Sequence, residues 1–270
     1  MNAIEAKENK ERHTQATHIE CTDLQLTIGG RVLYNNINLS LKSGEVWAVL
    51  GLNGAGKTTL LHTLAGIRLA GAGQININAK RIEQWTRVEL ARQIGLLLQT
   101  QQDPFPGKVI EHVLIGRHPH LTAMQWESEQ DYQLAQQALN RVGLDGFENR
   151  SLETLSGGEY QRMLIAMVLV QQPQCFLLDE PVNHLDWQHQ HQILNTLANM
   201  AKEQSNSILM ALHDVNLAAR YCSHCLMLFD NGQFVAGKTE ELLDRERLEQ
   251  LYHTPISAID GPEGLIFIPK

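Results

Sequence analysis

The stretch Gly51-Leu52-Asn53-Gly54-Ala55-Gly56-Lys57-Thr58 has the composition and spacing of a phosphate-binding loop, and every fixed position of G-x-x-x-x-G-K-[ST] is matched. Its glycines let backbone N–H groups close around phosphate oxygens, and the N-terminus of a following helix attracts an anion. In such a loop Lys57 reaches the β- and γ-phosphates and the Thr58 hydroxyl is a ligand for Mg²⁺. A chance match in a chain of this length is on the order of one per cent by average residue usage.

Two carboxylates, Asp179 and Glu180, follow the apolar run Phe176-Leu177-Leu178. Ligands of open α/β sheets bind at the carboxyl ends of the strands, which is where these side chains would lie. Asp179 suits a metal-coordinating carboxylate, and Glu180 is placed to polarise an attacking water. Alone, such a run is equally typical of a strand-to-loop cap. With a phosphate-binding loop upstream, it predicts the second half of a nucleotide site.

A third element is Leu155-Ser156-Gly157-Gly158-Glu159. Ser156 is typical of a helix N-cap, and the glycines after it let the backbone approach an anion closely. Taken alone, this element is better explained by a simple N-capped helix.

The regions around these motifs alternate between apolar runs and helical patterns. Apolar runs at 46–50, 175–178 and 208–212 predict buried strands, and 57–67 predicts a helix. The alternation predicts an α/β fold with a mostly parallel sheet.

Other elements interrupt or flank this pattern. Turns at Gly29-Gly30 and Asn35-Asn36 indicate antiparallel hairpins near the N-terminus. The helix-rich stretch from about 104 to 156 indicates an inserted helical subdomain. The segment Gly264–Ile268 is a predicted strand that we expect to pack against the core.

Bulk properties limit the classes of function. The chain has 270 residues, 43% of them hydrophobic, and a formal charge of −8, which argues against nucleic-acid binding through a general basic field. No run of 18 apolar residues occurs, so a role at a membrane requires a partner. The charged segment 1–18 is predicted to be a disordered tail. The four cysteines suggest no disulfide framework, which favours the cytosol.

The order of the P-loop, Leu155–Glu159, Asp179-Glu180 and a later His213 resembles that of ABC-type ATPases, over about residues 19–251. The resemblance implies a P-loop NTPase core with an N-terminal antiparallel β subdomain and an α-helical subdomain inserted at about 100–165. It implies a single ATPase domain over 19–253, followed by a short extension over 254–270.

The resemblance also assigns further residues. Gln99 matches the glutamine that contacts Mg²⁺ and the attacking water. Asn183-His184-Leu185-Asp186 matches the D-loop at the dimer interface, and His213 matches the histidine that holds the γ-phosphate and orients Glu180. One position departs from the family: Ile28 occupies the place of the aromatic residue that stacks on adenine, and Tyr34 is out of register.

These assignments give the following predicted site residues. The catalytic residues are Lys57, Gln99, Glu180 and His213, and the ligands of Mg²⁺ are Thr58, Gln99 and Asp179. The ATP-binding residues are Gly51, Asn53, Gly54, Ala55, Gly56, Lys57, Thr58, Thr59, Ser156, Gly157, Gly158 and Asp186. The signature serine and glycines face the ATP of a second copy in the family, so the resemblance implies a homodimer around two ATP.

The stretches 114–121 and 183–190 resemble the importer branch for metal chelates, which takes up vitamin B12, haem and ferric siderophores, and Gly116–His120 favours corrinoids slightly. This branch implies a membrane permease, indirectly a substrate-binding protein, no nucleic acid, and a peripheral location at the cytoplasmic face of the inner membrane. Alternatives are the ATPase of an ABC exporter or a soluble ABC protein. A ribosome-acting ABC protein would normally carry two cassettes, and a DNA-repair ATPase a long coiled coil or zinc insertion.

Overall fold

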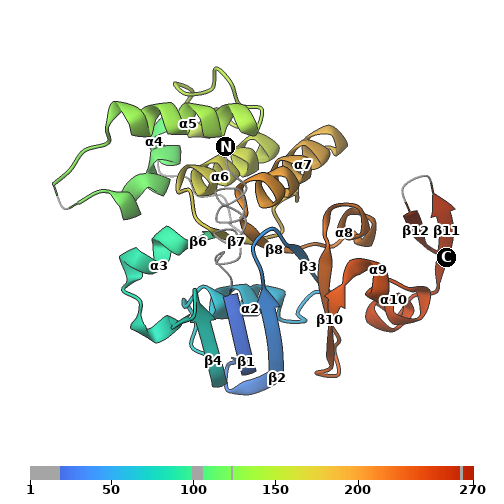
Figure 1. The fold of residues 1–270 in the computed structure, drawn as a ribbon. Coiled ribbons are helices and arrows are strands. Elements are labelled where there is room, and N and C mark those ends of the chain that lie inside the picture. Colours follow the sequence, from blue (N-terminus) through green and yellow to red (C-terminus); the bar gives the residue numbers. More distant parts are fainter. Residues whose placement is uncertain (1–18, 99–105, 123, 262–263) are drawn as a thin grey trace, which may run out of the picture.

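The computed structural model describes residues 19–98, 106–122, 124–261 and 264–270, and the predicted tail over 1–18 lies outside them. A six-stranded sheet with the order β10-β9-β3-β8-β7-β6 forms the centre (Figure 1). Its strands are β3 (Val46–Gly51), β6 (Ile94–Leu97), β7 (Cys175–Asp179), β8 (Ser207–Ala211), β9 (His224–Leu228) and β10 (Phe234–Lys238). Strand β10 is antiparallel to β9 and the other neighbouring pairs are parallel, so the predicted mostly parallel sheet is confirmed.

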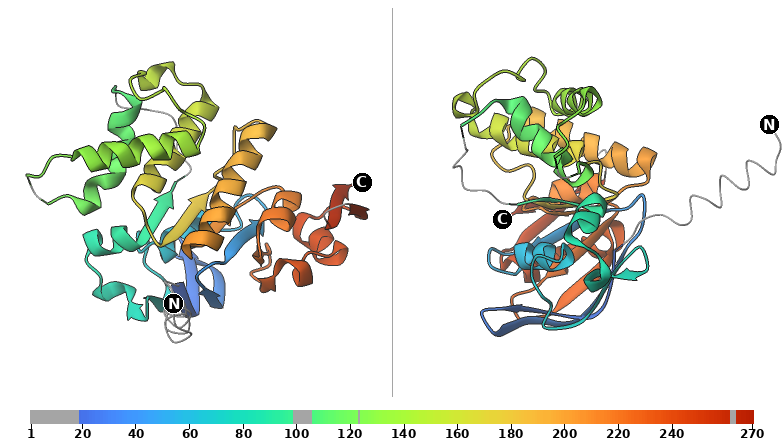
Figure 2. Two further views of the ribbon diagram at one scale, coloured as in Figure 1. Left: turned by 45° about the horizontal axis from the view of Figure 1, so that its top comes forward. Right: turned by 90° about the vertical axis from the view of Figure 1, so that its left-hand side faces the viewer.

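Layers of helix and strand cover the two faces of this sheet (Figure 2). One face carries α4 (Val109–Leu114), η2 (Ile115–His120), α5 (Glu129–Arg141), η3 (Leu152–Thr154), α6 (Gly157–Val170) and α7 (Trp187–Gln204). The other face carries α2 (Lys57–Leu64), η1 (Ile82–Gln84), α3 (Arg87–Gln93) and the N-terminal β subdomain. The predicted α/β core with an antiparallel β subdomain and a helical region is therefore confirmed.

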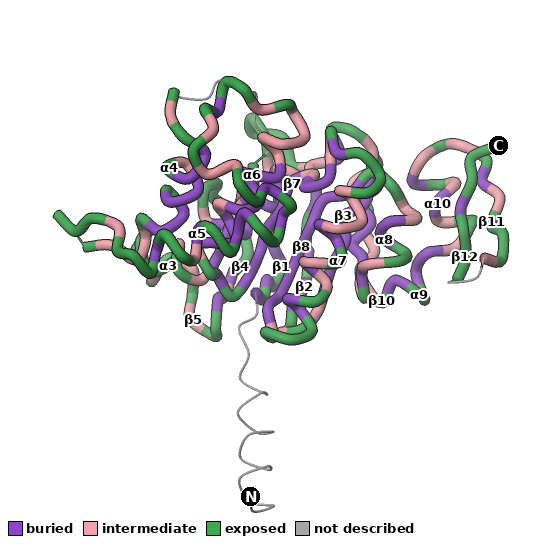
Figure 3. Tube along the Cα trace, turned by 90° about the horizontal axis from the view of Figure 1, so that it is seen from above, coloured by how far each residue is buried: buried purple, intermediate pink, exposed green. Residues whose placement is uncertain are grey.

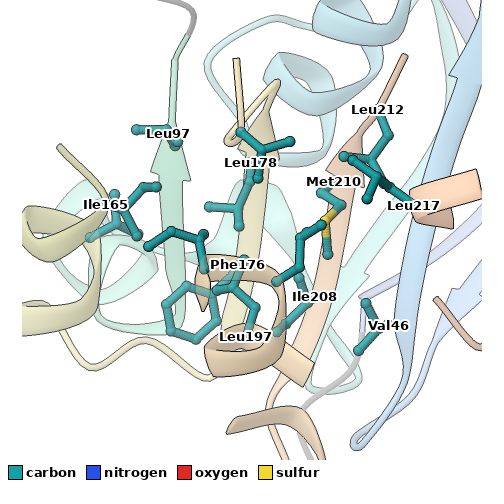
Figure 4. Packing of buried hydrophobic residues seen from close by; sticks show 14 of the residues in the cluster. Val46, Leu97, Ile165, Phe176, Leu178, Leu197, Ile208, Met210, Leu212 and Leu217 are labelled. Atoms are coloured by element: carbon teal, nitrogen blue, oxygen red, sulfur yellow. The ribbon is translucent and has the colours of Figure 1, made fainter. Parts of the chain in front are cut away.

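The core is split by the sheet because side chains alternate along each strand. On β7, Phe176 and Leu178 pack with Ile165 of α6 and Leu197 of α7, as Figure 4 shows, whereas Leu177 packs on the other face. Strands β3, β7 and β8 are buried along their whole length and are purple in Figure 3. A rigid, doubly covered sheet thus carries the loops at its carboxyl edge.

The β subdomain has the strand order β2-β1-β4-β5, with β1 (Ile19–Ile28), β2 (Arg31–Leu41), β4 (Ala72–Ile77) and β5 (Lys80–Arg81). The turn at Gly29-Gly30 is as predicted, with φ of 54° and 81°. The predicted turn at Asn35-Asn36 is wrong, because both residues lie within β2. There they form a bulge opposite Gln25, and Asn36 adopts φ 58°. Asparagine tolerates this left-handed conformation, which serves a bulge as well as a turn.

The C-terminal part follows the sheet with α8 (Val215–Tyr221), α9 (Thr239–Leu242), α10 (Arg245–Tyr252), β11 (Ile256–Gly261) and β12 (Gly264–Pro269). Strands β11 and β12 form a hairpin that contains the predicted C-terminal strand. The Asn216 side chain of α8 donates to the carbonyl of Phe267 and accepts from its amide, and the Phe267 side chain is buried. Among the described residues, no helix is both long and apolar enough to cross a membrane.

A buried ion pair holds the helical layer together. Arg117 Nε donates to Asp131 Oδ1 at 2.7 Å, and another nitrogen of its guanidinium donates to the carbonyl of Val170 at the end of α6. The other oxygen of Asp131 accepts from the amide and hydroxyl of Ser128, the N-cap of α5. Burial raises the pKa of Asp131, but Ser128 and Arg117 lower it more, to about 2.

This arrangement predicts a pH-dependent contribution of Asp131 to stability. The pKa of an aspartate is about 3.9 in unfolded chains, so its contribution is complete above that value and is lost as pH falls toward 2. We expect the gap in unfolding free energy between wild type and Asp131→Asn, from urea titrations at pH 5 to 2, to shrink as pH falls. The exposed Asp145→Asn is the control, and a gap independent of pH would contradict this role.

Candidate active site

The phosphate-binding loop connects β3 to α2, and its backbone requires glycine. Gly51, Gly54 and Gly56 have φ of 157°, 81° and 97°, and a Cβ on Gly51 would lie 2.7 Å from the carbonyl oxygen of Leu228. Gly56 is also the N-cap of α2. The loop therefore turns into the helix with its amides unobstructed by side chains.

Lys57 lies inside this loop rather than in solvent. Its side chain is buried, and Nζ donates to the carbonyls of Gly51 at 2.8 Å and Leu52 at 3.2 Å. Burial lowers the pKa of Lys57, while the carboxylates of Glu180 and Asp179 act to raise it. The ammonium is thus held at the centre of the loop with two acidic groups close enough to affect its charge.

Asp179 ends β7 as a buried carboxylate. Both of its oxygens are buried and lack a hydrogen-bond partner among the described residues. Burial raises its pKa, and the Thr58 hydroxyl and Lys57 act to lower it, although no hydrogen bond of standard geometry joins Thr58 to the carboxylate. Buried oxygens without partners beside a hydroxyl suit a hard divalent cation such as Mg²⁺, which binds few protein oxygens and keeps waters.

Glu180 is held on both of its carboxylate oxygens. Nε2 of His213, which follows β8, lies 2.5 Å from Oε1 of Glu180, and the side-chain amide of Asn183 donates to Oε2. Glu180 has φ 51°, a conformation that costs non-glycine residues on the order of 1–3 kcal/mol and is common at active sites. Only 11% of the Glu180 side chain is exposed, against 41% for His213. The carboxylate is therefore fixed in direction at the edge of the sheet.

The signature segment starts helix α6 as predicted. Ser156 is its N-cap, and Ser156 and Glu159 exchange hydrogen bonds through side chain and backbone. Gly158 packs against the D-loop, since a Cβ there would lie 3.1 Å from the carbonyl oxygen of His184. Among the described residues, no hydrogen bond joins Ser156 to the phosphate-binding loop.

The remaining predicted residues lie around this centre. Asp186 is the exposed N-cap of α7 and accepts from the His189 amide, and this bond and the His189 ring lower its pKa. Asn53, Ala55 and Thr59 belong to the loop and the first turn of α2. Gln99 lies outside the described residues.

Neither of the two residues considered for stacking on adenine, Ile28 and Tyr34, presents an exposed aromatic ring. Ile28 is at the end of β1 with 45% of its surface exposed. Tyr34 is buried, and its hydroxyl donates to the carbonyl of Phe229 at 2.8 Å. Its ring packs close to the phosphate-binding loop, because a Cβ on Gly56 would lie 3.6 Å from the ring. Tyr34 is therefore a packing residue.

Sequence reasoning missed the role of Asn183 at Glu180. The two residues are three apart in a turn that is closed by a hydrogen bond from the backbone amide of Asn183 to the backbone carbonyl of Glu180. That spacing, in a segment with turn-forming residues, was the available signal.

A family model and two relatives show what this chain is similar to. The family model for ABC transporters matches residues 34–183. The petrobactin import ATP-binding protein of Bacillus anthracis is 35% identical over 234 residues, covering 87% of this chain and 86% of that protein. The ferric enterobactin transport ATP-binding protein of Escherichia coli K12 is 35% identical over 240 residues, covering 88% and 89%.

Solved structures show the same relationship. A metal-chelate type ABC transporter in an inward-facing conformation superposes with a TM-score of 0.81 at 29% identity, covering 94% of this chain and 98% of that chain. A dimeric bacterial ABC transporter cassette superposes with a TM-score of 0.72 at 26% identity, covering 82% and 98%. The family model over residues 34–183 and these relatives show that this chain belongs to the ABC transporter family.

Proposed function

We propose that this chain is the ATP-hydrolysing subunit of an importer that takes up a metal chelate, with ferric siderophores as the favoured cargo. The observation that carries the proposal is the Glu180 carboxylate, oriented by His213 and Asn183 beside buried Lys57 and Asp179. The names of the relatives support ferric chelates over the corrinoids that Gly116–His120 favoured slightly.

The reaction is an in-line attack of water on the γ-phosphorus of ATP. Glu180 orients the water and accepts its proton, and His213 holds Glu180 and contacts the γ-phosphate. Lys57 neutralises charge on the β- and γ-phosphates. Thr58 and Asp179, together with Gln99, would hold Mg²⁺, which stabilises the developing charge when bound.

A second copy completes each site in this proposal. Ser156, Gly157 and Gly158 present a helix N-terminus that can bind the γ-phosphate of the partner's ATP, and Asp186 lies at the interface. ATP then joins two chains into a homodimer, and hydrolysis removes the contacts that hold it closed.

The dimer works from the cytoplasmic face of the inner membrane, as a peripheral subunit bound to integral permease subunits. A substrate-binding protein delivers the chelate, and nucleic acid plays no part. One ATPase domain covers residues 19–253, with a helical subdomain inserted at about 100–165, and residues 254–270 are a short extension.

Partner identification tests this function against its alternatives. The tagged chain is purified in mild detergent from membranes of its own cells, and its partners are identified by mass spectrometry. We expect a many-span permease together with a binding protein for an iron chelate. A permease with no import components would favour an exporter, and ribosomes or no membrane protein would exclude transport.

The missing aromatic at position 28 predicts a gain in ATP affinity from one substitution. Ile28→Tyr would supply a ring for the adenine to stack on, and such pairs add about 0.5–1.5 kcal/mol. We expect the Kd of a fluorescent ATP analogue to fall about two- to tenfold. Val88→Tyr on α3, at another exposed apolar position, is the control. An unchanged Kd in Ile28→Tyr would show that adenine binds elsewhere.

A further inference from the structure

Helix α2 carries a histidine on the same face as the predicted cation ligand Thr58. His62 is four residues after Thr58, and residues with this spacing are neighbours on a helix surface. Nε2 of His62 is buried and has no hydrogen-bond partner in the part of the chain that the structure describes. Buried polar atoms are nearly always paired, so an unpaired imidazole nitrogen next to a proposed cation site requires an explanation.

The carboxylate of Asp179 offers acceptors that could pair with His62. Within the described ranges its two oxygens are also buried without hydrogen-bond partners, and His62 is among the groups whose charge affects this carboxyl. Thr58 affects it as well. One helix face thus presents a hydroxyl and an imidazole toward a strand-end carboxylate, and the unsatisfied atoms consist of one possible donor and two acceptors.

We propose that His62 is a positioning residue for the nucleotide's divalent cation, with Nε2 linked to the Asp179 carboxylate through a bridging water. The proposal rests on the proposed function, because it requires Thr58 and Asp179 to hold that cation. His62 is not a catalytic residue in this scheme, since it acts through Asp179. Groups that orient the ligands of a metal in this way typically contribute 10- to 100-fold to metal affinity.

The test compares variants with and without a hydrogen-bond donor near the position of Nε2. His62→Leu keeps much of the volume and removes the nitrogen, whereas His62→Gln keeps an amide donor near the position of Nε2. His118→Leu replaces an exposed histidine of η2 and is the matched control. Binding of Mn²⁺ to the full chain is measured from the electron paramagnetic resonance signal of free Mn²⁺, with ATP kept below the protein concentration so that free ATP does not chelate the ion. ATP binding is measured separately in EDTA.

We expect His62→Leu to raise the Kd for Mn²⁺ by 10- to 100-fold and to leave ATP binding in EDTA unchanged. His62→Gln should recover most of the lost affinity, and His118→Leu should behave as wild type. Unchanged Mn²⁺ affinity in His62→Leu would overturn the proposal. Equal losses in both His62 variants, accompanied by weaker ATP binding in EDTA, would also overturn it, because they indicate a packing role.

Failure of this inference is distinguishable from failure of the proposed function. If wild type binds Mn²⁺ with ATP and the variants do not differ, His62 has no positioning role but the nucleotide site stands. If wild type binds no ATP in either condition, the nucleotide site itself is wrong and both proposals fall.

Discussion

Replacing Glu180 with glutamine should leave a protein that binds ATP and dimerises on it but hydrolyses it about 10²- to 10⁴-fold more slowly. The amide is nearly isosteric and can still bond to His213 and Asn183, so the loop that adopts φ 51° should keep its shape. It cannot accept a proton from the attacking water. The lost step is therefore the chemical one, and ATP binding is spared.

Two measurements on Glu180→Gln separate chemistry from binding. Phosphate release under saturating Mg·ATP reports hydrolysis, and light scattering after size-exclusion chromatography with ATP reports the dimer. The control is Glu240→Gln, an exposed glutamate of α9, which should match wild type in both. Hydrolysis at the wild-type rate in Glu180→Gln would exclude Glu180 as the general base.

Replacing Arg117 with methionine should destabilise the fold by about 3–5 kcal/mol, the range for removing one partner of a buried ion pair. The substitution leaves the Asp131 carboxylate buried without its cation and removes the bond to the Val170 carbonyl. Because Arg117 links η2 to α5 and to the end of α6, we expect the loss of stability to affect the helical layer most. Denaturant unfolding followed by circular dichroism measures it.

A control variant and a rescue variant accompany Arg117→Met. Arg245→Ala breaks an exposed pair with Glu249 and should change stability by about 1 kcal/mol or less. Adding Asp131→Asn to Arg117→Met removes the stranded charge but keeps an acceptor for Ser128, so the double variant should be more stable than Arg117→Met alone. A loss below 1 kcal/mol in Arg117→Met, or no coupling between the two sites, would contradict this account.

Arg117 also shows how a pattern in the sequence can be attributed to the wrong cause. Gly116–His120 resembled a marker of cargo class, but the structure explains part of it by packing. Arg117 is buried against Asp131, and a Cβ on Gly116 would lie 2.1 Å from the carbonyl oxygen of Met167. Both residues serve the helical layer, which is a reason to give the slight preference for corrinoids little weight.

The sequence by itself determined those features that depend on neighbours along the chain. The glycines of the phosphate-binding loop, the Ser156 cap and the turn at Gly29-Gly30 all follow from local backbone preferences. The buried strand before Asp179 and the parallel sheet follow from apolar runs that alternate with helical patterns. The turn predicted at Asn35-Asn36 is a bulge, because asparagine in the left-handed backbone conformation occurs in both turns and bulges.

Only the tertiary structure decided which distant side chains meet. His213 reaches Glu180 across 33 positions because β8 lies between β3 and β7, so the loop after β8 opens between the phosphate-binding loop and the acidic pair. The unpaired atoms of His62 and Asp179 and the Arg117–Asp131 pair depend likewise on how helices pack on the sheet. Periodicity reports which face of an element is buried, but strand order and helix placement determine what that face contacts.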